Sequence, residues 1–151
     1  MKGVSKMGGK INALDLRKDF PASPREISGG FAHLARMRDK ARATAAGTVG
    51  DYRYFCPLDQ ALLEFVQISR EEFYEAAQKM ENEELSRWFR EKGSKHSEEE
   101  IRKWNQAFLS KRPETPEKKA YFLETRNKIN PKRTDVETWA DLLDLEEGRL
   151  K

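Results

Sequence analysis

The densest group of chemically useful side chains follows two consecutive glycines in the first third of the chain. On a helix, His33, Arg36 and Lys40 would fall at positions i, i+3 and i+7 and would share one face. Three potential cations on one face could hold a phosphate or a carboxylate, and free backbone N–H groups at the helix start would add to this site. The competing interpretation is a basic face in water, with Asp39 paired locally to Arg36 or Arg42. Spacing alone favours this second interpretation.

A second group of candidates surrounds the one cysteine of the chain. Cys56 precedes Pro57, and proline suits the first position of a helix. A helix N-terminus favours the reactive thiolate, so Cys56 is a candidate nucleophile. The commoner role for such a residue is a small buried hydrophobe, here beside Tyr54. Asp59 would be the third residue of this helix, where a carboxylate either stabilises the first turn or orients a cation.

Several other chemistries find no support in the sequence. A single cysteine excludes an internal disulfide and a zinc site built from cysteines. His33 and His96 lie 63 positions apart and match no metal-ligand spacing, so we expect no metal site. No motif indicates a cofactor, which stays unknown. The three tryptophans fall on helical stripes and are expected in the core rather than as stacking platforms for bases.

Start and stop signals predict about seven short amphipathic helices. Capping boxes are expected at Ser69 with Glu72, at Ser97 with Glu100 and at Thr134 with Glu137. The predicted helices cover residues 31–46, 57–66, about 70–80, 82–92, 98–112, 116–129 and a last stretch that ends at Gly148. Residues 14–27 contain Phe20-Pro21 and Ser23-Pro24, which predict an extended lead-in.

The predicted fold class is therefore mainly all-α. We expect an irregular bundle of about six or seven short helices, an extended N-terminal lead-in and at most one short strand near Tyr52–Phe55, a run rich in β-forming residues. Residues 1–13 are rich in glycine, lysine and serine and predict a flexible tail. Residues 14–151 predict a single α-helical domain.

Composition and charge narrow the possible partners. No uncharged run exceeds nine residues, which argues against a membrane partner, and no signal peptide is visible, so we expect a cytoplasmic protein. Residues 1–56 carry 11 basic and 5 acidic side chains, whereas residues 57–100 carry 6 and 12. The acidic middle would repel a polyanion, which argues against nucleic acid as the partner. The oligomeric state stays open.

The two most specific segments of the chain are Arg36-Met37-x-Asp39-Lys40-x-Arg42 and Cys56-Pro57-Leu58-Asp59-Gln60. Further segments lie at Pro21-x-Ser23-Pro24-Arg25, at Tyr52 and Tyr54, and at Asp141-Leu142-Leu143-Asp144-Leu145. Together these segments resemble the bacterial domain-of-unknown-function family DUF5069. The resemblance covers about residues 14–147 and implies no activity, substrate or cofactor. It does single out the charged residues, which core packing explains less easily than it explains the apolar ones.

These observations lead to one preferred function and two alternatives. We expect a domain that binds a small anion or metabolite in a polar pocket between the first helix and the Tyr52–Asp59 segment. The expected binding residues are His33, Arg36, Asp39, Lys40, Arg42, Tyr54, Cys56 and Asp59. The first alternative is an enzyme that uses Cys56 as its nucleophile, and the second is a module that docks a protein or a nucleic acid. An ion-pair network that only fixes the fold would also account for the same residues.

Overall fold

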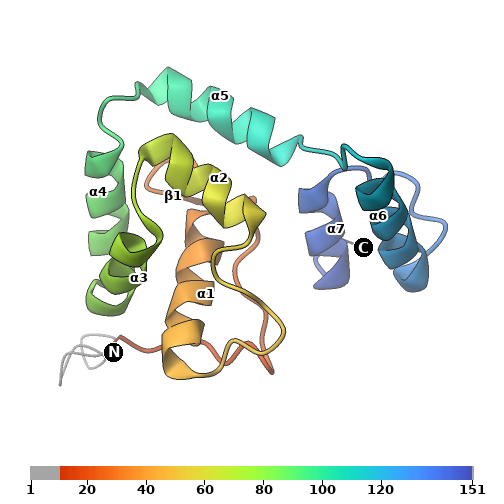
Figure 1. The fold of residues 1–151 in the computed structure, drawn as a ribbon, viewed down its shortest axis with the longest axis horizontal. Coiled ribbons are helices and arrows are strands. Elements are labelled where there is room, and N and C mark those ends of the chain that lie inside the picture. The colour runs from red at the N-terminus through yellow and green to blue at the C-terminus, as the bar shows by residue number, and fades with distance from the viewer. Residues whose placement is uncertain (1–10, 151) are drawn as a thin grey trace.

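The computed structural model describes residues 11–150, and the predicted tail falls almost entirely outside them. Within these residues the chain forms two very short strands followed by seven helices (Figure 1). The strands are β1 (Ile27–Ser28) and β2 (Phe31–Ala32), and the helices are α1 (Leu34–Ala46), α2 (Pro57–Val66), α3 (Arg70–Lys79), α4 (Asn82–Lys92), α5 (Glu98–Leu109), α6 (Pro116–Ile129) and α7 (Trp139–Glu146). The mainly α-helical fold class is confirmed.

Polar side chains set the starts of most helices, because the first turn of a helix has backbone N–H groups without helical partners. The Ser69 hydroxyl accepts from Glu72 N, and Ser97 with Glu100 forms a complete capping box. The Thr115 hydroxyl caps α6. The last helix differs from the prediction, since Thr138 rather than Thr134 accepts the capping hydrogen bond, from Asp141 N.

The two strands pair as an antiparallel hairpin whose turn is Gly29-Gly30. Both glycines have positive φ, of 59° and 90°, which side chains other than glycine rarely adopt. The hairpin occupies a stretch where no strand was expected and delays the first helix to Leu34. The predicted strand run at residues 52–55 is instead an irregular connection between α1 and α2, since its residues pair with no other backbone segment.

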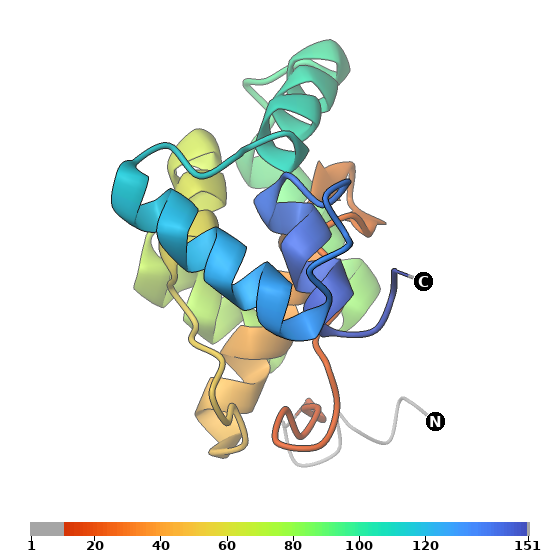
Figure 2. The ribbon, with the colours of Figure 1, turned by 90° about the vertical axis from the view of Figure 1, so that its right-hand side faces the viewer.

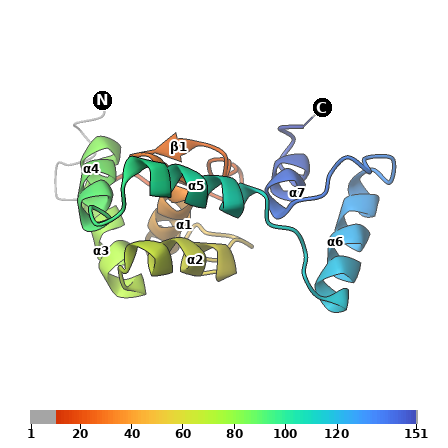
Figure 3. The same ribbon diagram turned by 90° about the horizontal axis from the view of Figure 1, so that it is seen from above.

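The helices gather around two hydrophobic cores. The larger core takes its buried side chains from β2 and α1–α5, and at its centre the Phe89 ring meets the Phe31 and Phe73 rings edge-on. The smaller core lies between α6 and α7 and contains Phe122, Val136, Leu142 and Leu145. Figures 1 and 3 show α6 and α7 beside the group formed by α1–α5, and Figure 2 views the molecule from the side of this helix pair.

Candidate functional site

A buried carboxylate at the start of α2 organises the first polar cluster. Asp59 Oδ1 lies 2.7 Å from His33 Nε2, and Oδ2 lies 2.9 Å from Lys40 Nζ. Oδ2 also accepts the backbone N–H groups of Phe55 and Cys56 at 2.8 and 3.1 Å. The side chains of His33 and Asp59 are fully buried, and that of Lys40 is nearly so. We call His33, Lys40, Cys56 and Asp59 the Asp59 cluster.

The cysteine of this cluster sits against a cation. Cys56 is the N-cap residue of α2 and forms its capping box with Asp59. Lys40 Nζ lies 3.1 Å from Cys56 Sγ, within hydrogen-bond distance for sulfur. Cys56 is partly exposed, whereas its two partners Lys40 and Asp59 are buried. The thiol of this partly exposed residue therefore lies against an ammonium group at the start of a helix.

Two residues at the cluster, His33 and Phe55, have strained backbone conformations. His33 has a φ of 73° and Phe55 a φ of 81°, although neither residue is a glycine. Such conformations cost roughly 1–3 kcal/mol each and persist only where the surrounding structure enforces them. The left-handed conformation of His33, which precedes α1, lets its ring reach Asp59 rather than cap that helix.

Burial and charge determine the protonation of the cluster. Burial alone would raise the pKa of Asp59, but the hydrogen bond from His33 and the charge of Lys40 outweigh it and hold that pKa well below its usual value. Burial lowers the pKa of His33, because the opposing effect of Asp59 is smaller. The ionised Asp59 only accepts hydrogen bonds, so His33 donates from Nε2. His33 Nδ1 is then a buried acceptor that has no hydrogen-bond partner among the described residues.

Arg36 belongs to a different cluster, although it shares a helix face with Lys40. Its guanidinium forms two hydrogen bonds to the Glu147 carboxylate, at 2.8 and 3.0 Å. Glu147 also accepts from the Tyr52 hydroxyl at 2.8 Å and from Arg149. Burial alone would raise the pKa of Glu147, but the hydrogen bonds and the charge of Arg36 outweigh this effect. The pKa of Glu147 is therefore lower than its ordinary value.

The same network extends to the N-terminal lead-in. Arg25 contacts Asp144 at 2.8 Å and Asp141 at 2.5 Å, and Arg149 pairs with Asp144 and donates to the Pro21 carbonyl. We call these residues, together with Arg36 and its partners, the Glu147 network. It connects the lead-in and α1 to the C-terminal segment.

The remaining predicted residues have separate partners. Asp39 accepts from Ala22 N and pairs with Arg38, not with Arg36 or Arg42. The Tyr54 hydroxyl donates to the Arg70 carbonyl. These two side chains therefore brace the lead-in and the start of α3.

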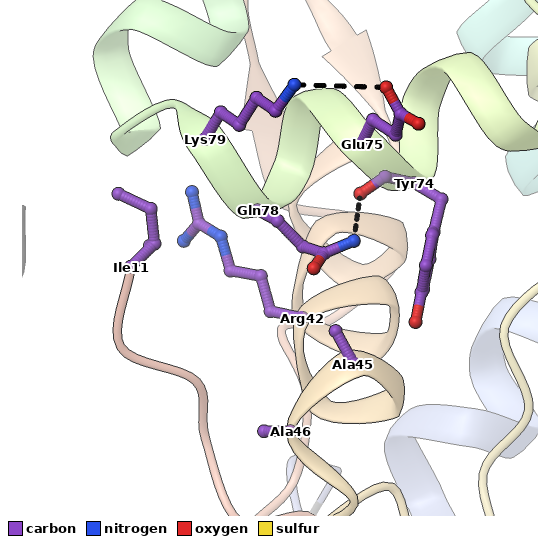
Figure 4. Close-up of a pocket in the computed structure, with 8 residues that line it drawn as sticks. All are labelled: Ile11, Arg42, Ala45, Ala46, Tyr74, Glu75, Gln78 and Lys79. Atoms are coloured by element: carbon purple, nitrogen blue, oxygen red, sulfur yellow. Dashed lines mark hydrogen bonds and ion pairs between the residues drawn. The ribbon is translucent and has the colours of Figure 1, made fainter. Parts of the chain in front are cut away.

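Arg42 points away from both clusters. It donates to the carbonyls of Ala77 and Met80 and to Asn82, and so closes the C-terminal end of α3. Burial, together with the charge of Arg38, lowers its pKa to about 10. Arg42 lines a cavity of about 510 Å³ between α1 and α3, together with the other residues labelled in Figure 4. Its three nitrogens are committed to these protein acceptors, so this cavity has no free guanidinium.

Besides the cavity at Arg42, residues 11–150 form further cavities whose linings lack the members of the Asp59 cluster. One of about 610 Å³ separates the lead-in from α6 and α7, and its wall includes Tyr52 and Glu147. One of about 670 Å³ lies between the hairpin, α4 and α5. None of these cavities is lined by a member of the Asp59 cluster. Cys56 is the partly exposed member of the cluster, since His33, Lys40 and Asp59 are buried.

The structure thus unites four of the eight predicted site residues and distributes the others. Arg25, Tyr52 and Asp144 were not predicted as site residues, although they occur in the segments that resemble DUF5069. Glu147 and Arg149 had no such signal, because a charged residue near a helix end is ordinarily solvated.

The arrangement of the metal-ligating and the apolar side chains bears on two of the expected partners. Within residues 11–150, no three side chains of the metal-ligating types are placed to hold an ion together. None of the helices in this range combines the length and the apolar character needed to cross a bilayer. Trp88, Trp104 and Trp139 pack against the two cores, as their helical spacing predicts.

Comparison with known proteins identifies the family but no characterised relative. No curated protein matches the chain. The model of the domain of unknown function DUF5069 matches residues 18–149, which include every residue of the two clusters. This match covers nearly the whole chain and confirms the resemblance seen in the sequence. The chain belongs to the DUF5069 family.

Proposed function

We propose that this domain performs thiol chemistry, with Cys56 as a nucleophile that attacks an electrophilic substrate. The observation that carries the proposal is the 3.1 Å contact between Lys40 Nζ and Cys56 Sγ at the start of α2. Thiolate rather than thiol is the nucleophile, and a neighbouring cation and a helix N-terminus both stabilise it. In this proposal Cys56 is the reacting group, and Lys40 holds its negative charge.

Asp59 and His33 act as positioning residues in this proposal. Asp59 holds the Lys40 ammonium through a 2.9 Å ion pair, so that Lys40 directs another of its N–H groups at the sulfur. His33 and two backbone N–H groups occupy the remaining acceptor sites of Asp59 and fix its orientation. The strain at His33 and Phe55 supports the proposal, since strained backbone gathers where a fixed geometry is needed.

Alkylation of the thiol tests this proposal, because Cys56 is the only cysteine. We expect iodoacetamide to label the folded chain at neutral pH faster than it labels the same chain in urea, although folding buries part of the thiol. A hydrogen bond to a charged group contributes roughly 1.5–3 kcal/mol. In the Lys40→Met variant the labelling rate should therefore fall about tenfold or more. Mass spectrometry measures the rate, and circular dichroism verifies that the variant is folded.

Two controls make the result specific. Cys56→Ser should take no label, and Lys103→Met, which removes an ammonium on the exposed surface of α5, should leave the rate unchanged. Labelling that is equally fast in wild type and Lys40→Met, or no faster in the folded than in the unfolded chain, contradicts the proposal.

Binding of a small anion, the function preferred from the sequence, becomes the second candidate, and one observation favours it. Lys40 and the N-terminus of α2 converge on a partly exposed position next to Cys56. Arg36, by contrast, is already bound to Glu147, so an anion at that guanidinium would have to displace a carboxylate. If an anion binds beside Lys40, phosphate should slow the alkylation of Cys56 more than chloride does at equal ionic strength. Equal rates in the two salts would contradict this second candidate.

A further inference from the structure

A groove lined by apolar residues and arginines lies at the hairpin, and none of its lining residues belongs to these clusters. Its volume is about 670 Å³, and it is formed by β1, the Gly29-Gly30 turn, α4 and α5. Ile27, Ile101 and Leu109 supply apolar surface. Ile27 is 54% exposed, so its aliphatic side chain is free to contact a ligand in the groove. The groove shares no residue with the Asp59 cluster or the Glu147 network.

Three arginines line this groove, and one acid accompanies them. Arg87 and Arg90 lie three positions apart on α4, and Arg102 lies on α5. Arg102 pairs with Glu99 of its own helix. Neither Arg87 nor Arg90 has a hydrogen bond or an ion pair with any residue between 11 and 150. Glu98 is the only acidic side chain in the lining, so the groove carries an excess of positive charge.

The walls of the groove are held in place before any ligand arrives. Asn105 accepts from Ala32 N and donates to the Gly30 carbonyl, which fixes the hairpin to α5. The hydroxyls of Ser28 and Ser86 lie 2.6 Å apart and fix it to α4. Gly29 packs so closely on α4 that an added Cβ would lie 2.9 Å from the Ser86 carbonyl oxygen. A preformed groove avoids the entropic cost of ordering its walls when it binds.

We infer that this groove binds a small amphipathic anion, with a hydrocarbon body between the hairpin and α5 and an acidic head group at Arg87 and Arg90. The groove volume falls within the range of small-molecule sites, which are mostly apolar and contain a few polar groups that orient the ligand. Guanidinium groups bind carboxylate and phosphate oxygens through paired hydrogen bonds. Two arginines without a partner among residues 11–150 are therefore available for this head group. The same apolar walls would not retain a fully polar anion.

Octanoate and octyl phosphate are the probes that test this inference, because they combine one chain with the two head-group chemistries. We expect millimolar octanoate or octyl phosphate to shift the amide resonances of residues 27–30 and of α4 and α5 in the full-length protein. Acetate lacks the chain and 1-octanol lacks the charge, so both should bind much more weakly. Whichever of the two anions binds with the higher affinity shows whether the preferred head group is a carboxylate or a phosphate.

Two double variants distinguish specific binding in the groove from nonspecific attraction of an anion to the positive charge of the protein. Removing both groove arginines by Arg87→Gln and Arg90→Gln should raise the dissociation constant about tenfold or more, since charge-assisted hydrogen bonds are lost. The matched control is Lys118→Gln with Lys119→Gln, which removes two exposed charges from α6 and should leave affinity unchanged. Ile27→Thr should weaken octanoate without altering the fold, because Ile27 is exposed.

Any one of the following results would overturn the inference. They are no shifts with either anion, shifts that map outside the groove, and equal affinity in the two double variants. Tight binding of 1-octanol would show an apolar site without anion recognition and would equally reject it. None of these results depends on the reactivity of Cys56.

Discussion

The two polar clusters of this protein share helix α1 but differ in how far along the chain their partners lie. His33 and Asp59 of the Asp59 cluster are 26 residues apart, whereas Arg36 and Glu147 are 111 residues apart. The first cluster lies within the α1–α5 group and sets the entry to α1 and α2. The second connects that group to α7, whose buried leucines pack in the smaller core instead.

Neighbouring cations on one helix face can therefore have different partners and different structural roles. Lys40 and Arg36 lie one turn apart, yet one supports a partly exposed thiol and the other attaches the C-terminal helix. Buried ion pairs contribute little net stability compared with apolar packing, but breaking one is costly. We therefore expect loss of either carboxylate to be harmful, with different parts of the molecule responding.

We expect the greatest loss of stability from a substitution in the Asp59 cluster. Asp59→Asn removes the charge that compensates buried Lys40 and should cost about 3–5 kcal/mol in the free energy of unfolding. Urea denaturation measures this change. Asp51→Asn is the control, because Asp51 is exposed and its loss should change stability by less than about 0.5 kcal/mol. Similar midpoints for the two variants would show that the cluster is not structurally important.

A smaller but more localised effect should follow Glu147→Gln. Arg36 would keep a neutral acceptor but lose its ion pair, at a cost of roughly 1.5–3 kcal/mol. Hydrogen exchange should accelerate in α7 more than in α1–α4, since the Glu147 network attaches that helix. Glu146→Gln, at the exposed neighbouring position, should leave exchange unchanged. Uniform acceleration throughout the chain would refute the distinction between the two clusters.

The dependence of stability on pH should isolate His33. Because burial lowers the pKa of His33 in the folded state, the unfolded chain takes up this proton first as the pH falls from 7 to 5. The contribution of His33 to the free energy of unfolding is complete above pH ~6.5, the pKa of histidine in an unfolded chain. Below this pH the contribution declines by at most about 1.4 kcal/mol per pH unit.

The variant His33→Asn tests this assignment, because asparagine tolerates the positive φ at this position. The difference between urea midpoints at pH 7 and pH 5 should be smaller in the variant than in the wild type. His96 is present in both proteins and does not affect the comparison. An unchanged pH dependence would mean that His33 does not cause it.

The smallest expected effect concerns the exposed edge of the Glu147 network. The Arg25 side chain is 40% exposed, so Arg25→Gln should cost only about 0.2–1 kcal/mol, and high salt should reduce the difference. Arg17→Gln is the comparison, because Arg17 is exposed and pairs locally with Asp15, two residues away. A larger cost that salt does not change would place Arg25 with the buried part of the network.

The sequence predicted most helices within a few residues, because their start and stop signals are local. Ser69, Ser97 and Thr115 cap helices through hydrogen bonds to residues three positions later, so a short window contains the necessary information. The hairpin at residues 27–32 was missed because it has only two residues in each strand and no alternating pattern.

Local sequence also indicated which residues carry chemistry, but not which of them meet. Lys40, Cys56 and Asp59 were recognised as candidates from their types and from their places on predicted helices. Helical spacing put Arg36 with Lys40, but Glu147, which binds Arg36, follows α7 and becomes a neighbour only when the C-terminal segment packs against α1. Likewise, Arg87 and Arg90 became a candidate site only when the hairpin and α5 formed the rest of the groove. Amino-acid type and short-range spacing thus determined the helices and the candidate charges, whereas tertiary packing decided their partners, because electrostatic pairing depends on distances in space that spacing along the chain does not set.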